Sequence, residues 1–119
     1  MDLVRRILLE IEEKGGPNVS VDGYDETTVN YHLALLKEAG LIKANVYGID
    51  QQPVLGVEVE GLTWDGHEFL NAARNDTVWS KTKDLVKEKA GSVTFSVFKI
   101  ALEEVAKKLI LSNLGGAVF

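Results

Sequence analysis

Two adjacent residues of the chain, His67 and Glu68, begin like the His-Glu-x-x-His motif of zinc proteases. In that motif a second histidine lies four residues after the first, so that both imidazoles reach one metal ion from the same face of a helix. This sequence has Asn71 at that position, and its other histidine, His32, is distant along the chain. Cysteine is absent, which removes thiolate ligands and a cysteine nucleophile. We therefore predict no metal site and no cofactor.

The carboxylates Glu58 and Glu60 are a second pair of side chains that could do chemistry, because they share one face of a predicted strand. Glycosidases use two carboxylates that flank the scissile bond, but nothing near this pair indicates an enclosed cleft. No Gly-rich phosphate loop and no Ser-His-Asp arrangement is recognisable. We therefore predict that the protein is not an enzyme and has no catalytic residues. A site at Asp65, His67 and Glu68 stays open only if folding forms a deep polar pocket there.

The elements that position these residues follow from the spacing of apolar side chains and from caps and turns. Val54 to Gly61 alternates valine with glutamate, which is typical of a strand with one packed and one solvated face. Asp25 is a good helix N-cap, and Gly40 suits a left-handed C-cap. The predicted elements are a first helix ending before Gly15, a brief strand at 18–21, a helix at 25–39, strands at 41–47 and 54–61, and helices at about 65–74, 76–89 and 94–114.

Two blocks of sequence carry a resemblance to a known fold. They are Asp25-Glu26-Thr27-Thr28-Val29-Asn30-Tyr31-His32-Leu33 running to Ala39-Gly40-Leu41-Ile42, and Leu62-Thr63-Trp64-Asp65-Gly66. With the order of elements, they resemble the recognition helix and the return from the wing of winged-helix DNA-binding domains. The resemblance implies an α+β, mostly helical fold with a two- or three-stranded antiparallel wing. We expect a winged-helix-like domain at residues 1–74 and a C-terminal helical extension at 75–119, packed on the domain or forming a dimer interface.

A closer resemblance rests on three stretches. They are Met1-Asp2-Leu3-Val4-Arg5, then Asn30-Tyr31-His32-Leu33, and Leu62-Thr63-Trp64-Asp65-Gly66-His67-Glu68-Phe69-Leu70 continuing to Arg74-Asn75-Asp76-Thr77-Val78-Trp79. The chain is similar here to the domain-of-unknown-function 2513 family of short bacterial and phage proteins, over nearly its whole length. That family has no established activity, so the resemblance implies a fold and not a function.

The chain departs from the usual winged helix between its first two predicted helices. Only the eight residues Pro17 to Tyr24 separate them, too few for the helix that a helix-turn-helix places there. We therefore expect that helix to be absent. If the protein nevertheless reads DNA, the contacts would come from the outward face of the second helix, with the ribbon assisting. The candidate residues are Thr27, Thr28, Asn30, Tyr31, Lys37 and Lys43.

The distribution of charge opposes DNA binding. Residues 1–62 hold five basic and eleven acidic side chains, a net charge of −6, whereas residues 63–119 hold eight basic and seven acidic ones, a net charge of +1. Affinity for nucleic acid comes largely from Lys and Arg that neutralise phosphates. The acidic half favours a protein-binding adaptor that engages a basic partner, with Glu58 and Glu60 in the contact surface. The family resemblance implies a phage or mobile-element origin for such an adaptor. Both hypotheses stay open.

The last predicted helix is apolar over more than one face. Its main stripe includes Phe98, Leu102, Val105 and Leu109. Packing within the chain would explain part of the stripe, and a homodimer interface would explain the remainder. We therefore predict these four residues as candidates for protein interaction. The tryptophans Trp64 and Trp79 lie among apolar neighbours and are expected to anchor the core.

The composition is typical of a soluble globular protein, with 45% apolar and 26% charged residues. Charged side chains interrupt the first eleven residues, which is unlike a secretory signal. No apolar run approaches the ~20 residues that a membrane helix needs. We predict a cytoplasmic location, no membrane partner and no small-molecule ligand.

Overall fold

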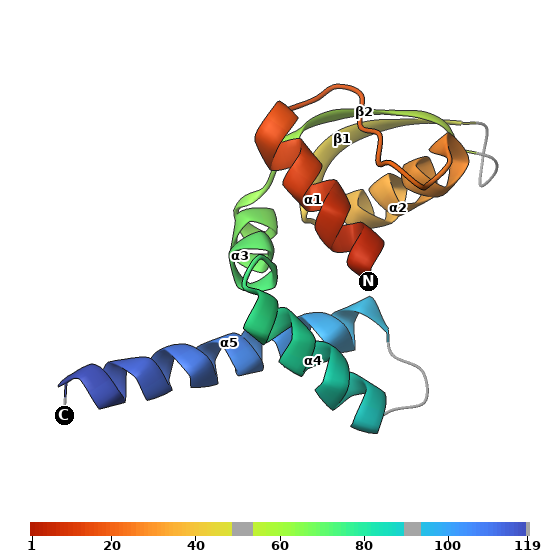
Figure 1. Cartoon of the computed structure of the whole chain (residues 1–119). Coiled ribbons are helices and arrows are strands. Elements are labelled where there is room, and N and C mark those ends of the chain that lie inside the picture. The colour runs from red at the N-terminus through yellow and green to blue at the C-terminus, as the bar shows by residue number, and fades with distance from the viewer. Residues whose placement is uncertain (49–53, 90–93, 119) are drawn as a thin grey trace. The chain divides into compact units, whose positions relative to one another are not determined.

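The computed structural model describes residues 1–48, 54–89 and 94–118. Within these residues the chain forms, in order, α1 (Asp2–Lys14), α2 (Glu26–Glu38), β1 (Ile42–Gly48), β2 (Val54–Leu62), α3 (Trp64–Ala73), α4 (Asp76–Lys89) and α5 (Phe95–Val118) (Figure 1). The fold is α+β and mostly helical, with a two-stranded antiparallel sheet, as the sequence predicts. This order is consistent with a winged-helix-like arrangement, and no helix lies between α1 and α2. The chain divides into two compact units, Met1–Leu70 and Asn71–Phe119.

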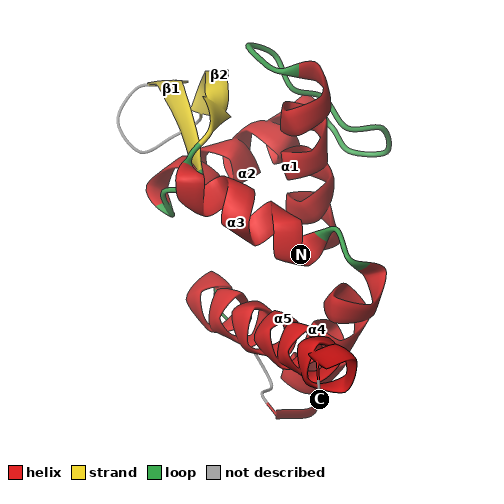
Figure 2. Cartoon of the chain, turned by 90° about the vertical axis from the view of Figure 1, so that its left-hand side faces the viewer, coloured by secondary structure: helices red, strands yellow, loops and turns green. Residues whose placement is uncertain are grey.

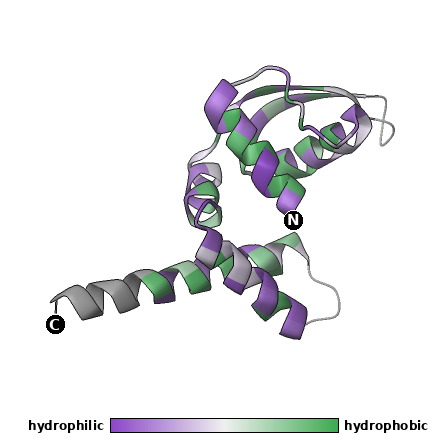
Figure 3. Cartoon of the chain, in the orientation of Figure 1, coloured by the Kyte–Doolittle hydropathy of each residue, from purple (hydrophilic) through white to green (hydrophobic). Residues whose placement is uncertain are grey.

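Helix α1 supplies much of the core of the first unit. Leu3, Val4, Ile7, Leu8 and Ile11 are all buried, as their helical spacing predicts. Hydrophobic and hydrophilic residues alternate accordingly along its ribbon in Figure 3. Helices α1 and α2 both contact the sheet, so its packed face is covered by helices.

The sheet separates a packed face from a solvated one. Ala44 pairs with Val59, and Val46 with Val57, and of these Ala44, Val57 and Val59 are buried. The intervening Asn45 and Glu58 are paired with each other and exposed. This alternation follows from the two-residue period of a strand, and it leaves the outer face of the ribbon in solvent.

The prediction of a brief strand at residues 18–21 is wrong. Those residues form no ladder, although the backbone N–H of Val59 donates to the Pro17 carbonyl at 2.9 Å. Pro17 has no N–H to return a hydrogen bond, so pairing with β2 does not propagate from it. Val21 is nevertheless buried, and it fixes the loop between α1 and α2 on the core.

The junction between the ribbon and α3 shows why the stretch Leu62-Thr63-Trp64-Asp65-Gly66 contains a threonine and a glycine at these positions. The Thr63 hydroxyl donates to the Gly40 carbonyl at 2.6 Å and accepts from the Gly66 N–H at 3.0 Å, so it caps α3 while binding the end of α2. The Thr63 N–H donates to the Leu41 carbonyl at 3.0 Å. A Cβ at position 66 would lie 2.0 Å from the same Leu41 oxygen, so this close approach requires glycine.

The second unit is a pair of contacting helices, α4 and α5 (Figure 2). The buried rings of Trp79 and Phe98 meet edge to face, with centroids 5.1 Å apart. Thr82 is also buried, and its hydroxyl donates to the Val78 carbonyl at 2.7 Å. Leu102 completes this apolar contact and is fully buried. Among the described residues, none of the helices has the length and apolar character needed to cross a membrane.

Candidate interaction surface

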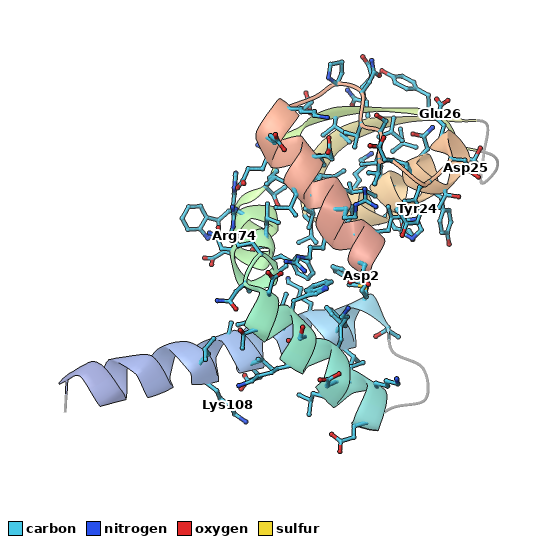
Figure 4. All side chains as sticks on the ribbon, in the orientation of Figure 1. Asp2, Tyr24, Asp25, Glu26, Arg74 and Lys108 are labelled. Carbon is cyan, nitrogen blue, oxygen red and sulfur yellow. The ribbon has the colours of Figure 1, made fainter. Side chains whose placement is uncertain are left out.

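Helix α2 begins at a fixed point because Asp25 caps it. The Asp25 carboxylate accepts a hydrogen bond from the Thr28 N–H at 2.7 Å. Hydrogen bonding to Thr28 also holds the pKa of Asp25 below its usual value. Figure 4 shows Tyr24, Asp25 and Glu26 together at this end of the helix. The cap sets which residues of α2 point outward.

The outward face of α2 carries two large apolar side chains. Tyr31 is 51% exposed and Leu35 is 43% exposed, one helical turn apart. Thr27 and Glu38 are also exposed and lie on the same side of the helix by its 3.6-residue period. We call these four residues the Tyr31–Leu35 face. An apolar centre with a polar rim is typical of protein interfaces.

The structure separates the residues predicted to contact DNA. Thr27, Tyr31 and Lys37 are exposed on α2, and Thr28 is half-buried there. Lys43 is exposed on the ribbon. Asn30 was expected to face solvent and read base edges, and this expectation is wrong because the residue is only 8% exposed.

Asn30 is buried because it lies next to Val29 on the side of α2 that meets β2. It lines a pocket of about 310 Å³ at this place. Sequence reasoning missed the pocket, because helical periodicity puts position 30 between the packed and solvated sides and cannot show a gap against a strand. The residues around the pocket come from the loop after α1, from α2 and from β2: Asn18, Val19, Ser20, Tyr24, Glu26, Val29, Asn30, Gly56 and Val57.

The outer face of the ribbon is polar and carries two carboxylates. Glu58 and Glu60 are exposed on β2, as the strand alternation predicts. The Tyr47 hydroxyl donates a hydrogen bond to Oε1 of Glu58. This hydrogen bond, and the negative charge of Glu58, raise the pKa of Tyr47. With Lys43, these side chains form a mixed but mainly acidic surface.

The four apolar candidates of the last helix divide into two pairs. Phe98 and Leu102, predicted as interaction residues, are buried within the chain, so their expected exposure to a partner is wrong. The Phe98 ring packs against Trp79 of α4. The helical pattern alone cannot reveal this contact, because the two residues are distant along the chain. Val105 and Leu109 are half-buried and line a groove of about 480 Å³. Leu85 and two lysines, Lys81 and Lys108, complete the lining.

The residues considered for metal binding or acid–base catalysis do not gather into a metal-binding cluster among the residues that the structure describes. Asp65, His67 and Glu68 are all exposed on α3. His32 is half-buried, and its Nδ1 lies 2.9 Å from the Thr28 carbonyl within α2. In the described part of the chain, no group of three or more His, Cys, Asp or Glu residues could hold a metal ion. Trp64, expected in the core, is 78% exposed at the first position of α3, so that prediction is also wrong.

The first unit is a small α+β module in which α2 packs on a two-stranded ribbon whose outer face is polar. Residues 1–92 match the family model described as hypothetical protein (DUF2513). The chain is also 37% identical over 118 residues to an uncharacterized protein of Haemophilus influenzae strain Rd, a match that covers 95% of each chain. The chain therefore belongs to the DUF2513 family. This confirms the resemblance to that family found in its sequence. No solved structure matches it.

Proposed function

We propose that this chain is a non-enzymatic interaction module whose acidic first unit binds a basic protein partner through the Tyr31–Leu35 face. The observation that carries the proposal is the exposure of Tyr31 and Leu35 side by side on α2. In chain order α2 corresponds to the recognition helix of a winged helix. Tyrosine is enriched among the residues that anchor protein interfaces.

The charge of the first unit supports the choice of partner. Residues 1–70 hold five basic and thirteen acidic side chains, a net charge of −8, whereas residues 71–119 hold eight basic and five acidic ones, a net charge of +3. On α2 itself Glu26 and Glu38 are exposed beside the single basic residue Lys37. Such a surface attracts a basic protein and speeds its association, while it repels the phosphates of DNA.

DNA binding is the alternative, and the winged-helix-like order of elements favours it. In that version the exposed residues Thr27, Tyr31, Lys37 and Lys43 would contact the duplex. Two or three phosphate contacts would give weak binding with a shallow dependence on salt. Fluorescence anisotropy with pooled genomic duplexes at low salt tests this alternative.

A pull-down tests the protein-binding proposal. The immobilised chain is incubated with bacterial lysate as wild type, as a Tyr31→Ala, Leu35→Ala double variant, and as the control Val97→Ala. Val97 is half exposed on α5, in the other unit, so the control removes a similar apolar side chain outside the proposed surface. We expect wild type and control to recover the same partner, and the double variant to lose it.

Equal recovery by the double variant would refute the Tyr31–Leu35 face. Duplex binding that Lys37→Ala abolishes would replace the proposal with the DNA version. A Glu58→Lys, Glu60→Lys variant extends the test to the ribbon, because both residues are exposed there. Unchanged recovery by this variant would remove the ribbon from the surface.

We also propose that the chain forms a homodimer through α4 and α5. The groove lined by Leu85, Val105 and Leu109 supports this proposal, because these apolar side chains are not used by the contact between Trp79 and Phe98. A second copy of the same helix pair could cover them symmetrically. A cytoplasmic location is a separate proposal, and the charged side chains among the first eleven residues and the absence of cysteine support it.

A further inference from the structure

We propose that the open edge of β2 beside Asn30 binds an extended peptide segment that carries a basic side chain. The site is the pocket of about 310 Å³ between the loop after α1, the start of α2 and β2. This volume is at the lower end of the range for small-ligand sites, so it fits a short segment and not a whole domain. The site is separate from the Tyr31–Leu35 face, and the proposal does not depend on that surface.

The backbone of Val57 is directed toward the pocket side of β2. The Val59 N–H points away from β1, because it donates to the Pro17 carbonyl. Along a strand, the N–H and C=O groups of every second residue point to the same edge. The N–H and C=O of Val57 therefore point to this edge too, and Val57 lines the pocket.

Asn18, Val19 and Ser20 line the pocket beside this edge without a hydrogen bond to the Val57 backbone. In the described part of the chain, no backbone hydrogen bond outside the sheet ladder involves Val57. An unpaired edge of this kind is a template for an incoming extended chain, which accepts from the N–H and donates to the C=O. The Pro17 carbonyl already accepts a hydrogen bond from the Val59 N–H at this edge. The peptide would pair in the same way with Val57, two residues earlier on β2.

Asn30 is more than nine-tenths buried and lines the pocket. An asparagine amide offers two donor hydrogens and an acceptor oxygen, which match the C=O and N–H of a peptide unit. In the described part of the chain the Asn30 amide makes no hydrogen bond, and it is not among the buried polar atoms that lack a partner, so its N and O atoms stay open to the pocket. A peptide unit that pairs with the amide would replace the water there.

The charge around the pocket favours a peptide with a basic side chain. Glu26 is the single carboxylate in the lining, and no Lys or Arg lines the pocket. The first unit as a whole carries a net charge of −8. A lysine or arginine next to the paired peptide unit would reach Glu26, while an acidic side chain would be repelled.

Nuclear magnetic resonance of the full ¹⁵N-labelled chain tests the proposal. The probe is the acetylated and amidated tripeptide Val-Lys-Val. We expect its addition to shift the backbone amide signal of Val57 and the side-chain amide signals of Asn30. Asn30→Ala should weaken binding by about tenfold, the loss expected for one hydrogen-bonded group. The matched control Asn45→Ala makes the same change on the outer face of the ribbon and should bind like wild type.

Three further probes make the result decisive. A peptide N-methylated at its central residue should not bind, because the methyl group blocks pairing with the strand edge, and Val-Glu-Val should bind more weakly than Val-Lys-Val. Leu35→Ala should leave peptide binding unchanged, which separates this site from the Tyr31–Leu35 face. If Asn30→Ala does not fold, Glu26→Gln replaces it and should weaken binding of Val-Lys-Val alone.

The proposal is overturned if neither Val57 nor Asn30 responds to the peptide. It is also overturned if the N-methylated peptide binds as well as the unmodified one, because no strand is then added. Equal binding of lysine amide alone would reduce the pocket to a site for a small cation. Wild-type affinity in both Asn30→Ala and Glu26→Gln would show that the peptide lies elsewhere.

Discussion

Replacement of Gly66 by alanine should destabilise the first unit strongly, although alanine is the better helix former. The new Cβ would lie 2.0 Å from the Leu41 carbonyl oxygen, where ordinary contacts begin at 3.4 Å. Helix α3 and the start of β1 must therefore separate by more than an ångström. That movement strains the hydrogen bond from the Thr63 N–H to the same oxygen and the capping bond from the Gly66 N–H to Thr63.

The size of the effect follows from three contributions. Overpacking costs about 1–3 kcal/mol, each weakened hydrogen bond costs about 1 kcal/mol, and the helix propensity of alanine returns about 1 kcal/mol. The net loss is about 2–4 kcal/mol, which corresponds to a fall of roughly 10–20 °C in the melting temperature of a domain of this size, at about 5 °C per kcal/mol.

Circular dichroism during urea and thermal unfolding measures this loss. The matched control is Gly56→Ala, because a Cβ at position 56 meets nothing within 4 Å. We expect the control to stay within about 0.5 kcal/mol of wild type. An unfolding midpoint of Gly66→Ala equal to or above that of wild type would refute the reasoning about this close approach.

Three other measurements test the surfaces and caps. Val105 lines the groove proposed as the dimer interface, so Val105→Glu should convert the dimer to a monomer in light scattering. The control Val97→Glu, at an exposed residue outside that groove, should leave the mass unchanged, and a monomeric wild type would contradict the dimer. In alkaline absorbance titration, Glu58→Gln should lower the raised pKa of Tyr47 toward its ordinary value, because the hydrogen bond to the carboxylate is the main cause of the shift; an unchanged titration curve would disprove that cause. The pKa of Asp25 is lower in the folded chain than its ordinary value of 3.8, so its cap stabilises the fold fully above that pH and loses this effect as the pH falls through the folded value. Asp25→Ala should therefore destabilise the chain near neutral pH and progressively less in acid, and a difference independent of pH would contradict the cap.

Local signals in the sequence predict most of the elements of this fold. The Asp25 cap and the valine and glutamate alternation of β2 are properties of a few consecutive residues, and the structure has both. The strand predicted at 18–21 failed because a strand needs a partner that returns its hydrogen bonds, and Pro17 cannot do so.

The candidate sites were harder to predict because exposure depends on contacts between distant segments. Asn30 has a polar side chain at the boundary of a helix face, and only the approach of β2 buries it. Phe98 belongs to an apolar stripe that suits either a core or an interface. It lies in the core because its ring packs against Trp79. The large aromatic side chain of Trp64 predicts a place in the core, yet its position at the start of α3 leaves it exposed to solvent.

The double role of the Thr63 hydroxyl has a consequence for local motion in the first unit. Because one side chain holds both the Gly40 carbonyl, just after the end of α2, and the Gly66 N–H, it couples the end of α2 to the first turn of α3. In hydrogen exchange, the amides of these two turns should open as one cooperative segment. A valine at position 63 would keep the shape of the side chain and divide that segment in two.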